Sequence, residues 1–217
     1  MAKLRFYILL LLGVLVSISG NAQYFKPKGS IYVETTIPTN EKNLAFQNTM
    51  EGLFHGGIGY QHSIWKGLTL GAGVNYSFFK INQFSLGQSI GNGGMHIPAV
   101  HLKIGYEKFT TERVSFYGGI RGGMSSIHVV NDSCEANLGG PYQTYTPFVE
   151  ALFELTILTE SGSQDAFNLS LGYSLYFKEY NADFLCRETL TGLIPEASDG
   201  IIRFLSIGFG YRYYFDK

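Results

Sequence analysis

Residues 206–217, SIGFGYRYYFDK, alternate large apolar or aromatic side chains with small or polar ones. Taken in steps of two, one side carries Ile207, Phe209, Tyr211, Tyr213 and Phe215, and the other carries Ser206, Gly208, Gly210, Arg212 and Tyr214. A period of two is that of a β-strand. The second face is small and mixed, without the Lys, Glu and Thr of an ordinary solvated face. The stretch therefore predicts a strand with large apolar side chains on one face and small or mixed ones on the other.

The N-terminal residues predict an export signal. A basic start, MAKLR, precedes an apolar run, FYILLLLGVLVSIS, and a small-x-small site, GNAQ, which are the three parts of a signal peptide. The apolar run is short for a retained membrane helix of about 20 residues. We expect a signal peptide over residues 1–22, cleavage after Ala22 and a barrel domain over residues 23–217. No Cys follows the run, so a lipid anchor is not expected.

Charge and composition exclude some classes of protein. Loss of Lys3 and Arg5 with the signal leaves 14 of the 16 basic residues against 17 acidic ones, a charge near −3. This balance gives no electrostatic case for a nucleic-acid partner. Aromatic residues make up 15% of the chain, and 27 glycines accompany only 6 prolines. Such a composition favours sheet over helix.

Eight segments alternate in this way, and no helical period, internal repeat or linker separates them. They run over about 29–37, 52–65, 67–81, 96–109, 113–128, 144–158, 166–178 and 200–215. Between them, three connections are tight (66–67, 110–112, 160–165) and four are long (38–51, 82–95, 129–143, 179–199). Antiparallel neighbours would place all tight turns at one end and all long loops at the other. Outer-membrane barrels have this asymmetry, with short periplasmic turns, long extracellular loops and an even strand number.

The two faces of the segments favour a membrane barrel over a soluble exported barrel of the lipocalin type. Periodicity alone does not separate these alternatives. However, Gly, Ser and Asn dominate the polar face, which suits a crowded lumen better than a solvated exterior. Aromatic residues also gather near the strand ends, as in the two interfacial girdles of such barrels: Tyr106, Phe116, Phe167, Tyr213 and Phe215 toward the turns, and Phe54, Phe78 and Phe177 toward the loops.

The C-terminal strand resembles the closing strand of an outer-membrane barrel, with an aromatic end similar to the signal read by the barrel-assembly machinery. One departure is that Asp216 and Lys217 follow Phe215. With the NAQ junction and the eight-strand pattern, the chain resembles the small outer-membrane β-barrel family common in Bacteroidota, similar in architecture to OmpA-type and OmpX-type barrels.

This resemblance implies an all-β fold, an eight-stranded antiparallel up-and-down transmembrane β-barrel in the cell outer membrane. It implies contact with outer-membrane lipid and lipopolysaccharide, and with the assembly machinery. The implied assembly signal consists of Phe209, Tyr211, Tyr213 and Phe215.

The alternation places a set of charged side chains in the lumen. They are Glu34, Lys103, Glu107, Arg121, Glu150, Glu154 and Arg212, accompanied by His55 and His101. Since an unpaired buried charge is costly, these groups should pair. We favour a structural plug of ion pairs; the alternative is a proton or ion path gated by the same pairs.

Cys134 and Cys186 are the two cysteines of the chain, and they fall in the third and fourth long loops. Export carries them through an oxidising route, and two cysteines suffice for one bridge. We expect a disulfide that restrains these two loops, the alternative being free thiols.

No catalytic residue, metal site or cofactor is expected. A lipid A-modifying enzyme would need Ser, His and an acid at the membrane rim, and the candidates are His62 with Ser63 and Ser126 with His128. Neither pair lies in a nucleophile motif. His96 and His101 have opposite parities on one strand and cannot share a metal ion there. The Gly-rich SIGNGGMH lacks the Lys and the helix of a phosphate loop.

We therefore expect a non-enzymatic protein with a structural or interaction role. It would present extracellular loops and take another outer-membrane protein as a partner in a larger complex. The alternative is narrow, porin-like transport or lateral release of small or hydrophobic solutes, and the third hypothesis is lipid A modification.

Overall fold

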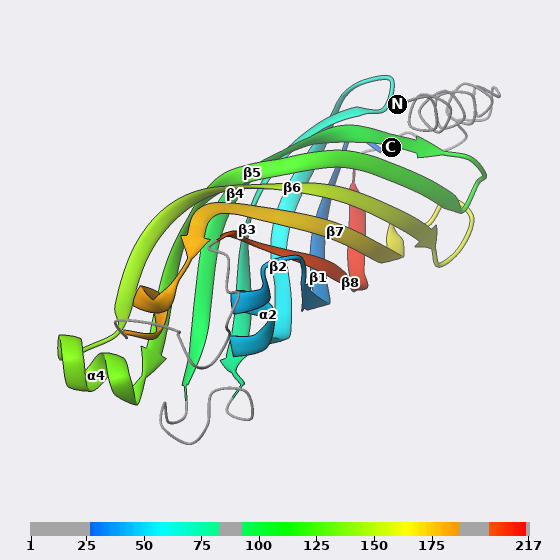
Figure 1. Ribbon diagram of the computed structural model, residues 1–217. Coiled ribbons are helices and arrows are strands. Elements are labelled where there is room, and N and C mark those ends of the chain that lie inside the picture. Colours follow the sequence, from blue (N-terminus) through cyan, green and yellow to red (C-terminus); the bar gives the residue numbers. More distant parts are fainter. Residues whose placement is uncertain (1–26, 83–92, 187–199, 216–217) are drawn as a thin grey trace, which may run out of the picture.

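The fold is a closed barrel in a computed structural model that describes residues 27–82, 93–186 and 200–215. Each strand is antiparallel to its neighbour, and β8 closes on β1 (Figure 1). The prediction of an eight-stranded antiparallel up-and-down barrel is confirmed. The predicted signal peptide, residues 1–22, lies outside the described residues.

The strands are longer than expected, chiefly at the ends that carry the long loops. They are β1 (Gly29–Asn40), β2 (Met50–Trp65), β3 (Leu68–Ile81), β4 (Gly93–Phe109), β5 (Val114–Asn131), β6 (Tyr142–Leu158), β7 (Asp165–Tyr180) and β8 (Gly200–Phe215). A tilted strand needs only about 10 residues to cross a membrane. The strands therefore project beyond the hydrocarbon, and two to five residues of each predicted long loop are strand.

The tight turns lie at the end of the barrel where β1 begins and β8 ends, and Figure 1 shows α2 and α4 at the opposite end. The turn between β2 and β3 consists of Lys66 at φ 43° and Gly67 at φ 96°. Two consecutive left-handed residues match the twist of a two-residue hairpin, and the second is a glycine as such turns favour. The predicted asymmetry of the connections is thus present.

Three short helical elements interrupt the loops, where we expected none. They are α2 (Leu44–Thr49), α4 (Asp132–Leu138) and the 3₁₀ helix η2 (Ala182–Leu185). Elements this short show no recognisable period, but α2 and α4 are capped by asparagines. Asn43 Oδ1 accepts from Phe46 N at 3.0 Å, and Asn131 Oδ1 accepts from Cys134 N at 2.7 Å. No helix in the described ranges is long and apolar enough to cross a membrane.

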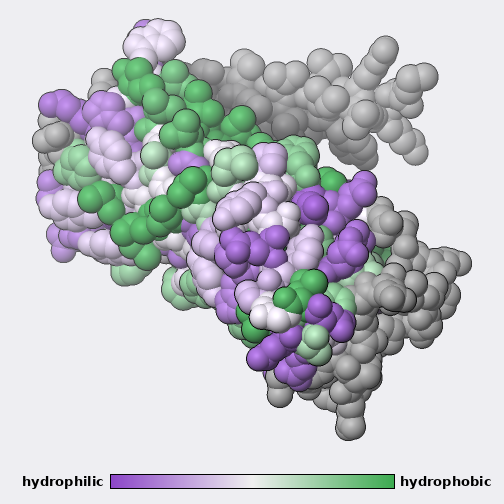
Figure 2. Space-filling view, turned by 90° about the vertical axis from the view of Figure 1, so that its left-hand side faces the viewer, coloured by the Kyte–Doolittle hydropathy of each residue, from purple (hydrophilic) through white to green (hydrophobic). Residues whose placement is uncertain are grey.

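The distribution of side chains is inverted relative to a soluble barrel. Large apolar residues point outward along every strand, for example Leu102, Phe209 and Ile207, each more than 60% exposed. Figure 2 shows such side chains gathered in patches on the outer surface. The charged side chains face the lumen instead. Water would not solvate this exterior, whereas the hydrocarbon of a membrane would.

Candidate functional site

The lumen contains a first ion-pair group built on Arg121 of β5. Its guanidinium donates to both carboxylate oxygens of Glu150 on β6, at 3.0 and 2.9 Å, and also to Glu34 on β1. His55 Nε2 lies 2.9 Å from Arg121 Nη2. All four side chains are buried. One cation thus pairs with two carboxylates on strands from both sides of the lumen.

A second group lies around Glu154 of β6. Lys103 Nζ donates to Glu154 Oε1 at 2.8 Å, and Arg212 of β8 donates to the other oxygen. Arg212 Nη1 also donates to Glu107 Oε1 at 3.2 Å, and Tyr214 Oη donates to the same oxygen at 2.5 Å. The Lys103 ammonium lies within about 5 Å of two tyrosine rings, those of Tyr32 and Tyr117.

The structure therefore brings all seven predicted charged residues into the lumen, and each takes part in at least one ion pair. The sequence parity located them, but their pairing depends on strands that meet only across the closed barrel. The two predicted histidines also lie there. His55 Nδ1 is 2.7 Å from Ser77 Oγ, and His101 lies between Asn75 and Tyr32.

The expectation of a polar lumen face is wrong for the loop-bearing half of the barrel. There the lumen holds an apolar cluster: Ala45, Phe46, Met50, Phe79, Ile81, Met95, Ile97, Ala99, Ile127, Val129, Phe148, Tyr176, Tyr180, Phe184, Leu185, Ile202 and Phe204. Met50, Met95, Val129 and Tyr180 lie where the strands extend beyond the predicted ranges, but most of the cluster, including Phe79, Ile97 and Phe204, lies at inward positions of the predicted segments. These side chains pack against one another and exclude water from this half of the lumen.

The apolar cluster anchors the loop helices inside the barrel mouth. Phe46 of α2 packs on the rings of Phe79 and Tyr180, with centroids 5.1 and 5.2 Å apart. Phe184 of η2 packs on Tyr142 and Tyr180, both at 5.0 Å. We expected the apolar residues of the fourth loop to pack against something, and Phe184 and Leu185 fill the mouth of their own barrel. Leu190, Leu193 and Ile194 lie outside the described residues.

The expected disulfide is present. Cys134 of α4 is bonded to Cys186 at the end of η2, with Cα atoms 4.9 Å apart. Asn137 Nδ2 donates to the Cys186 carbonyl at 2.8 Å. The bridge fastens α4 to η2, which is itself seated in the barrel mouth. The described parts of the third and fourth loops therefore form one anchored unit.

The predicted assembly signal lies outward at the end of β8. Phe209, Tyr211 and Tyr213 are exposed, and the Phe215 ring stacks on Tyr60 of β2 at 5.7 Å. β8 is also the closing strand, since Phe209 pairs with Thr35 of β1. Recognition of these residues by the assembly machinery stays a prediction.

The two candidate Ser–His pairs of an enzyme lie at different ends of the barrel wall. His62 contacts Tyr60 at 3.1 Å near the tight turns. Ser126 Oγ and His128 Nε2 are 2.8 Å apart on the outer wall, a nucleophile–base geometry. Within the described part of the chain, however, no carboxylate hydrogen-bonds the His128 ring, and no group of three or more His, Cys, Asp or Glu is placed to hold a metal ion. His96 lies outward and His101 inward, as predicted.

The inverted side-chain distribution and the closed eight-stranded barrel define the class: an integral β-barrel protein of the bacterial outer membrane. Its fold is shared with the Neisserial surface protein A (NspA), to which it is 13% identical, with a TM-score of 0.55 over 87% of this chain and 97% of that one.

Weaker likenesses of the same kind include OprG from Pseudomonas aeruginosa (13% identity, TM-score 0.47, 87% of this chain and 98% of that one) and Ail, the attachment invasion locus protein of Yersinia pestis (11%, 0.47, 87% and 100%). No protein-family model and no curated protein sequence matches the chain. The likeness to solved structures concerns the fold alone.

Proposed function

We propose that this protein is a non-enzymatic outer-membrane barrel with a structural or interaction role, presenting its loop end to a second protein outside the cell. The observation that carries the proposal is the anchoring of the loop elements. Phe46 and Phe184 hold α2 and η2 in the barrel mouth, and the Cys134–Cys186 bridge holds α4 to η2. Loops restrained on a rigid scaffold lose little conformational entropy on binding, which favours recognition.

The surface left by this anchoring offers apolar and charged groups together. Leu44 on α2 and Leu138 on α4 are 46% and 61% exposed, whereas Phe46 of α2 and Cys134 of α4 are buried. Glu135 on α4 and Asp183 on η2 are also exposed. A mixed surface of this kind is typical of protein interfaces.

Transport through the lumen is the less favoured alternative. The two ion-pair groups and the apolar cluster occupy successive levels of the lumen, which argues against an open polar path. Lipid A modification is less favoured again, because the Ser126–His128 pair has no acidic partner in the described ranges. Membership of the barrel family common in Bacteroidota rests on the NAQ junction and the strand pattern.

The test is affinity purification of the tagged protein from its own outer membrane in mild detergent, with the bound proteins identified. We expect a stoichiometric partner that is lost in the Leu44→Asp/Leu138→Asp variant. Glu160→Lys, a charge change in a tight turn at the other end of the barrel, is the matched control and should retain it. A solitary barrel, or a partner retained by the loop variant, would contradict the proposal. Conductance in a planar bilayer would favour transport instead.

A further inference from the structure

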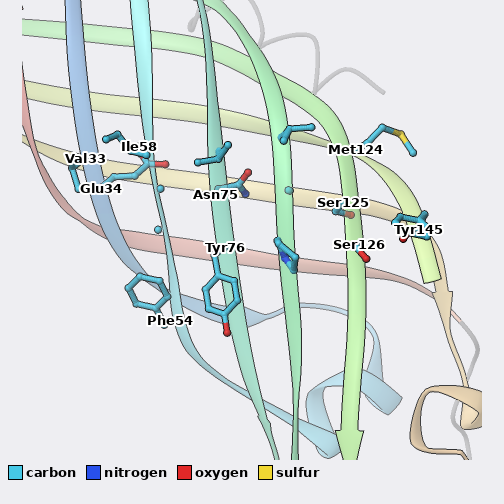
Figure 3. Close-up of a pocket in the computed structure, with 16 residues that line it drawn as sticks. Val33, Glu34, Phe54, Ile58, Asn75, Tyr76, Met124, Ser125, Ser126 and Tyr145 are labelled. Atoms are coloured by element: carbon cyan, nitrogen blue, oxygen red, sulfur yellow. The ribbon is translucent and has the colours of Figure 1, made fainter. Parts of the chain in front are cut away.

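A groove of about 800 Å³ crosses the outer wall from β1 to β6 (Figure 3). It exists because Gly56 on β2 and Pro98 on β4 carry no long side chain at outward positions. The Gly56 backbone also approaches β1 closely, since a Cβ there would lie 2.5 Å from the Glu34 carbonyl. Tyr76 of β3 and Tyr145 of β6 lie on either side of the groove.

The floor of the groove and its edge nearer the tight turns are apolar. Strand register places Val74, Val100 and Met124 side by side across β3, β4 and β5, and Val33 and Ile58 continue the row on β1 and β2. These five side chains are between 49% and 58% exposed. Nothing in the described residues covers them, so in a membrane their neighbours are acyl chains.

Beside the outward Phe54 and Phe78, the edge of the groove nearer the loops carries a polar group, and this is unusual for a lipid-facing wall. Register places His96 of β4 opposite His128 of β5, and His128 opposite Gln143 of β6. One step below, Ser126 is opposite Tyr145. All five side chains point outward.

Hydrogen bonds join the residues of this polar edge in three separate pairs. Tyr76 Oη and His96 Nδ1 are 2.5 Å apart, and Ser126 Oγ and His128 Nε2 are 2.8 Å apart. Gln143 Nε2 donates to Tyr145 Oη at 2.9 Å. Two imidazoles, three hydroxyls and one amide therefore lie on the outer face of four adjacent strands, next to the groove that Tyr76, Ser126 and Tyr145 help to line.

The depth of the polar edge matches a lipid headgroup. Tyr106, in the girdle near the tight turns, and His96 are ten residues apart on β4. For a tilted strand this separation is about 25 Å along the membrane normal, the height of the apolar band of an outer-membrane barrel. His96 and His128 thus lie level with the outer headgroups, and the groove lies directly beneath them.

We propose that this wall binds one lipid of the outer leaflet whose headgroup carries a phosphate, with an acyl chain in the groove. The donors around His96, His128 and Ser126 suit phosphate oxygens, which accept several hydrogen bonds at once. Lys80, one step further toward the loops on β3, also points outward, although Glu51 of β2 is opposite to it. The site depends on the barrel's location in the outer membrane and is independent of any protein partner.

The experiment is native mass spectrometry of the full-length barrel, released from detergent after incubation with phosphatidylglycerol. A glucosyl diacylglycerol with the same acyl chains is the phosphate-free comparison. We expect one tightly retained phosphatidylglycerol per barrel and about tenfold weaker retention of the glycolipid, as loss of one or two hydrogen bonds to a charged group implies.

Two variants test the two halves of the site separately. His96→Ala/His128→Ala should weaken retention of phosphatidylglycerol about tenfold and bring it near that of the glycolipid. Val100→Trp, which fills the groove, should weaken retention of both lipids. The matched controls are His62→Ala, an outward histidine bonded to a tyrosine at the other end of the barrel, and Ile207→Trp, an outward residue of β8; both should bind as the parent does.

Three results would overturn the proposal: equal retention of the two lipids by the parent barrel, unchanged retention in Val100→Trp, or displacement of the lipid by inorganic phosphate alone. Folding of each variant is checked by the shift in gel mobility between unheated and boiled samples. Because one variant removes polar side chains at the edge and the other adds an apolar ring in the groove, loss of one to misfolding leaves the other as a test.

Discussion

Removal of the Arg121 guanidinium should destabilise the barrel more than any other single charge deletion in its lumen. Glu150 and Glu34 are 0% and 3% exposed, and both pair with this one cation. Breaking a buried pair by removing one partner costs about 3–5 kcal/mol, because the remaining charge is left uncompensated. Arg121→Leu leaves two such carboxylates, so we expect a loss at the upper end, about 5 kcal/mol.

Urea unfolding in lipid vesicles measures this loss. The fluorescence of Trp65, the single tryptophan of the chain, is the probe, since it lies 66% exposed beside the tight turn between β2 and β3. The triple variant Glu34→Gln/Arg121→Leu/Glu150→Gln removes the stranded charges and should recover most of the stability. Lys28→Leu, which deletes an exposed cation, should change it by less than about 1 kcal/mol.

The reasoning would be refuted if Arg121→Leu lost less than about 1 kcal/mol, since the two carboxylates would then be hydrated and the lumen open to water. It would also be refuted if the free energy of unfolding fell as much in the triple variant as in Arg121→Leu. In that case the cost would come from packing of the arginine stem and not from charge.

Three further predictions concern the wall, the bridge and the serine. Phe209→Asp, on the lipid face of β8, should impair assembly at a cost of about 2 kcal/mol or somewhat less, whereas Phe209→Leu should assemble normally. The gel mobility of the folded form measures assembly, and normal assembly of the Asp variant would mean that the faces are inverted. Cys134→Ser/Cys186→Ser should speed tryptic cleavage of the outer loops while the barrel persists, and equal cleavage rates would show that packing of η2 alone holds them. Ser126→Ala should leave the acylation of membrane lipid A unchanged, as measured by mass spectrometry, and an altered acylation pattern would restore the enzyme hypothesis.

The barrel itself could be predicted from local pattern, because each piece of evidence for it lies within a few residues of the chain. Alternation in steps of two assigns Phe209 outward and Arg212 inward whatever their neighbours are. Turn lengths then order the strands, and side-chain size separates a lumen from a solvated exterior. The seven lumen charges and the two loop cysteines follow from the same alternation and topology.

The contents of the barrel mouth and the site on its wall were not predictable in this way. α2 and η2 are too short to show a period, and the strands run several residues past the point where their alternation was clear. The pattern therefore assigns Met50, Met95, Val129 and Tyr180 to loops, whereas the other strand residues of the cluster lie in predicted segments whose inward face is expected to be polar. Ser126 and His128 are close in the sequence itself, but their neighbours His96 and Gln143 belong to strands whose register the sequence does not specify.

The sequence by itself thus determined the strand number, the two faces, the direction of the loops and the identity of the buried charges. Only the tertiary structure decided which charges pair, since Arg121 reaches Glu34, 87 residues away, and that distance closes only when β8 meets β1. The physical reason is that the direction of a side chain, inward or outward, is set within one strand. Pairing, packing and the row of donors on the outer wall depend on the register between strands.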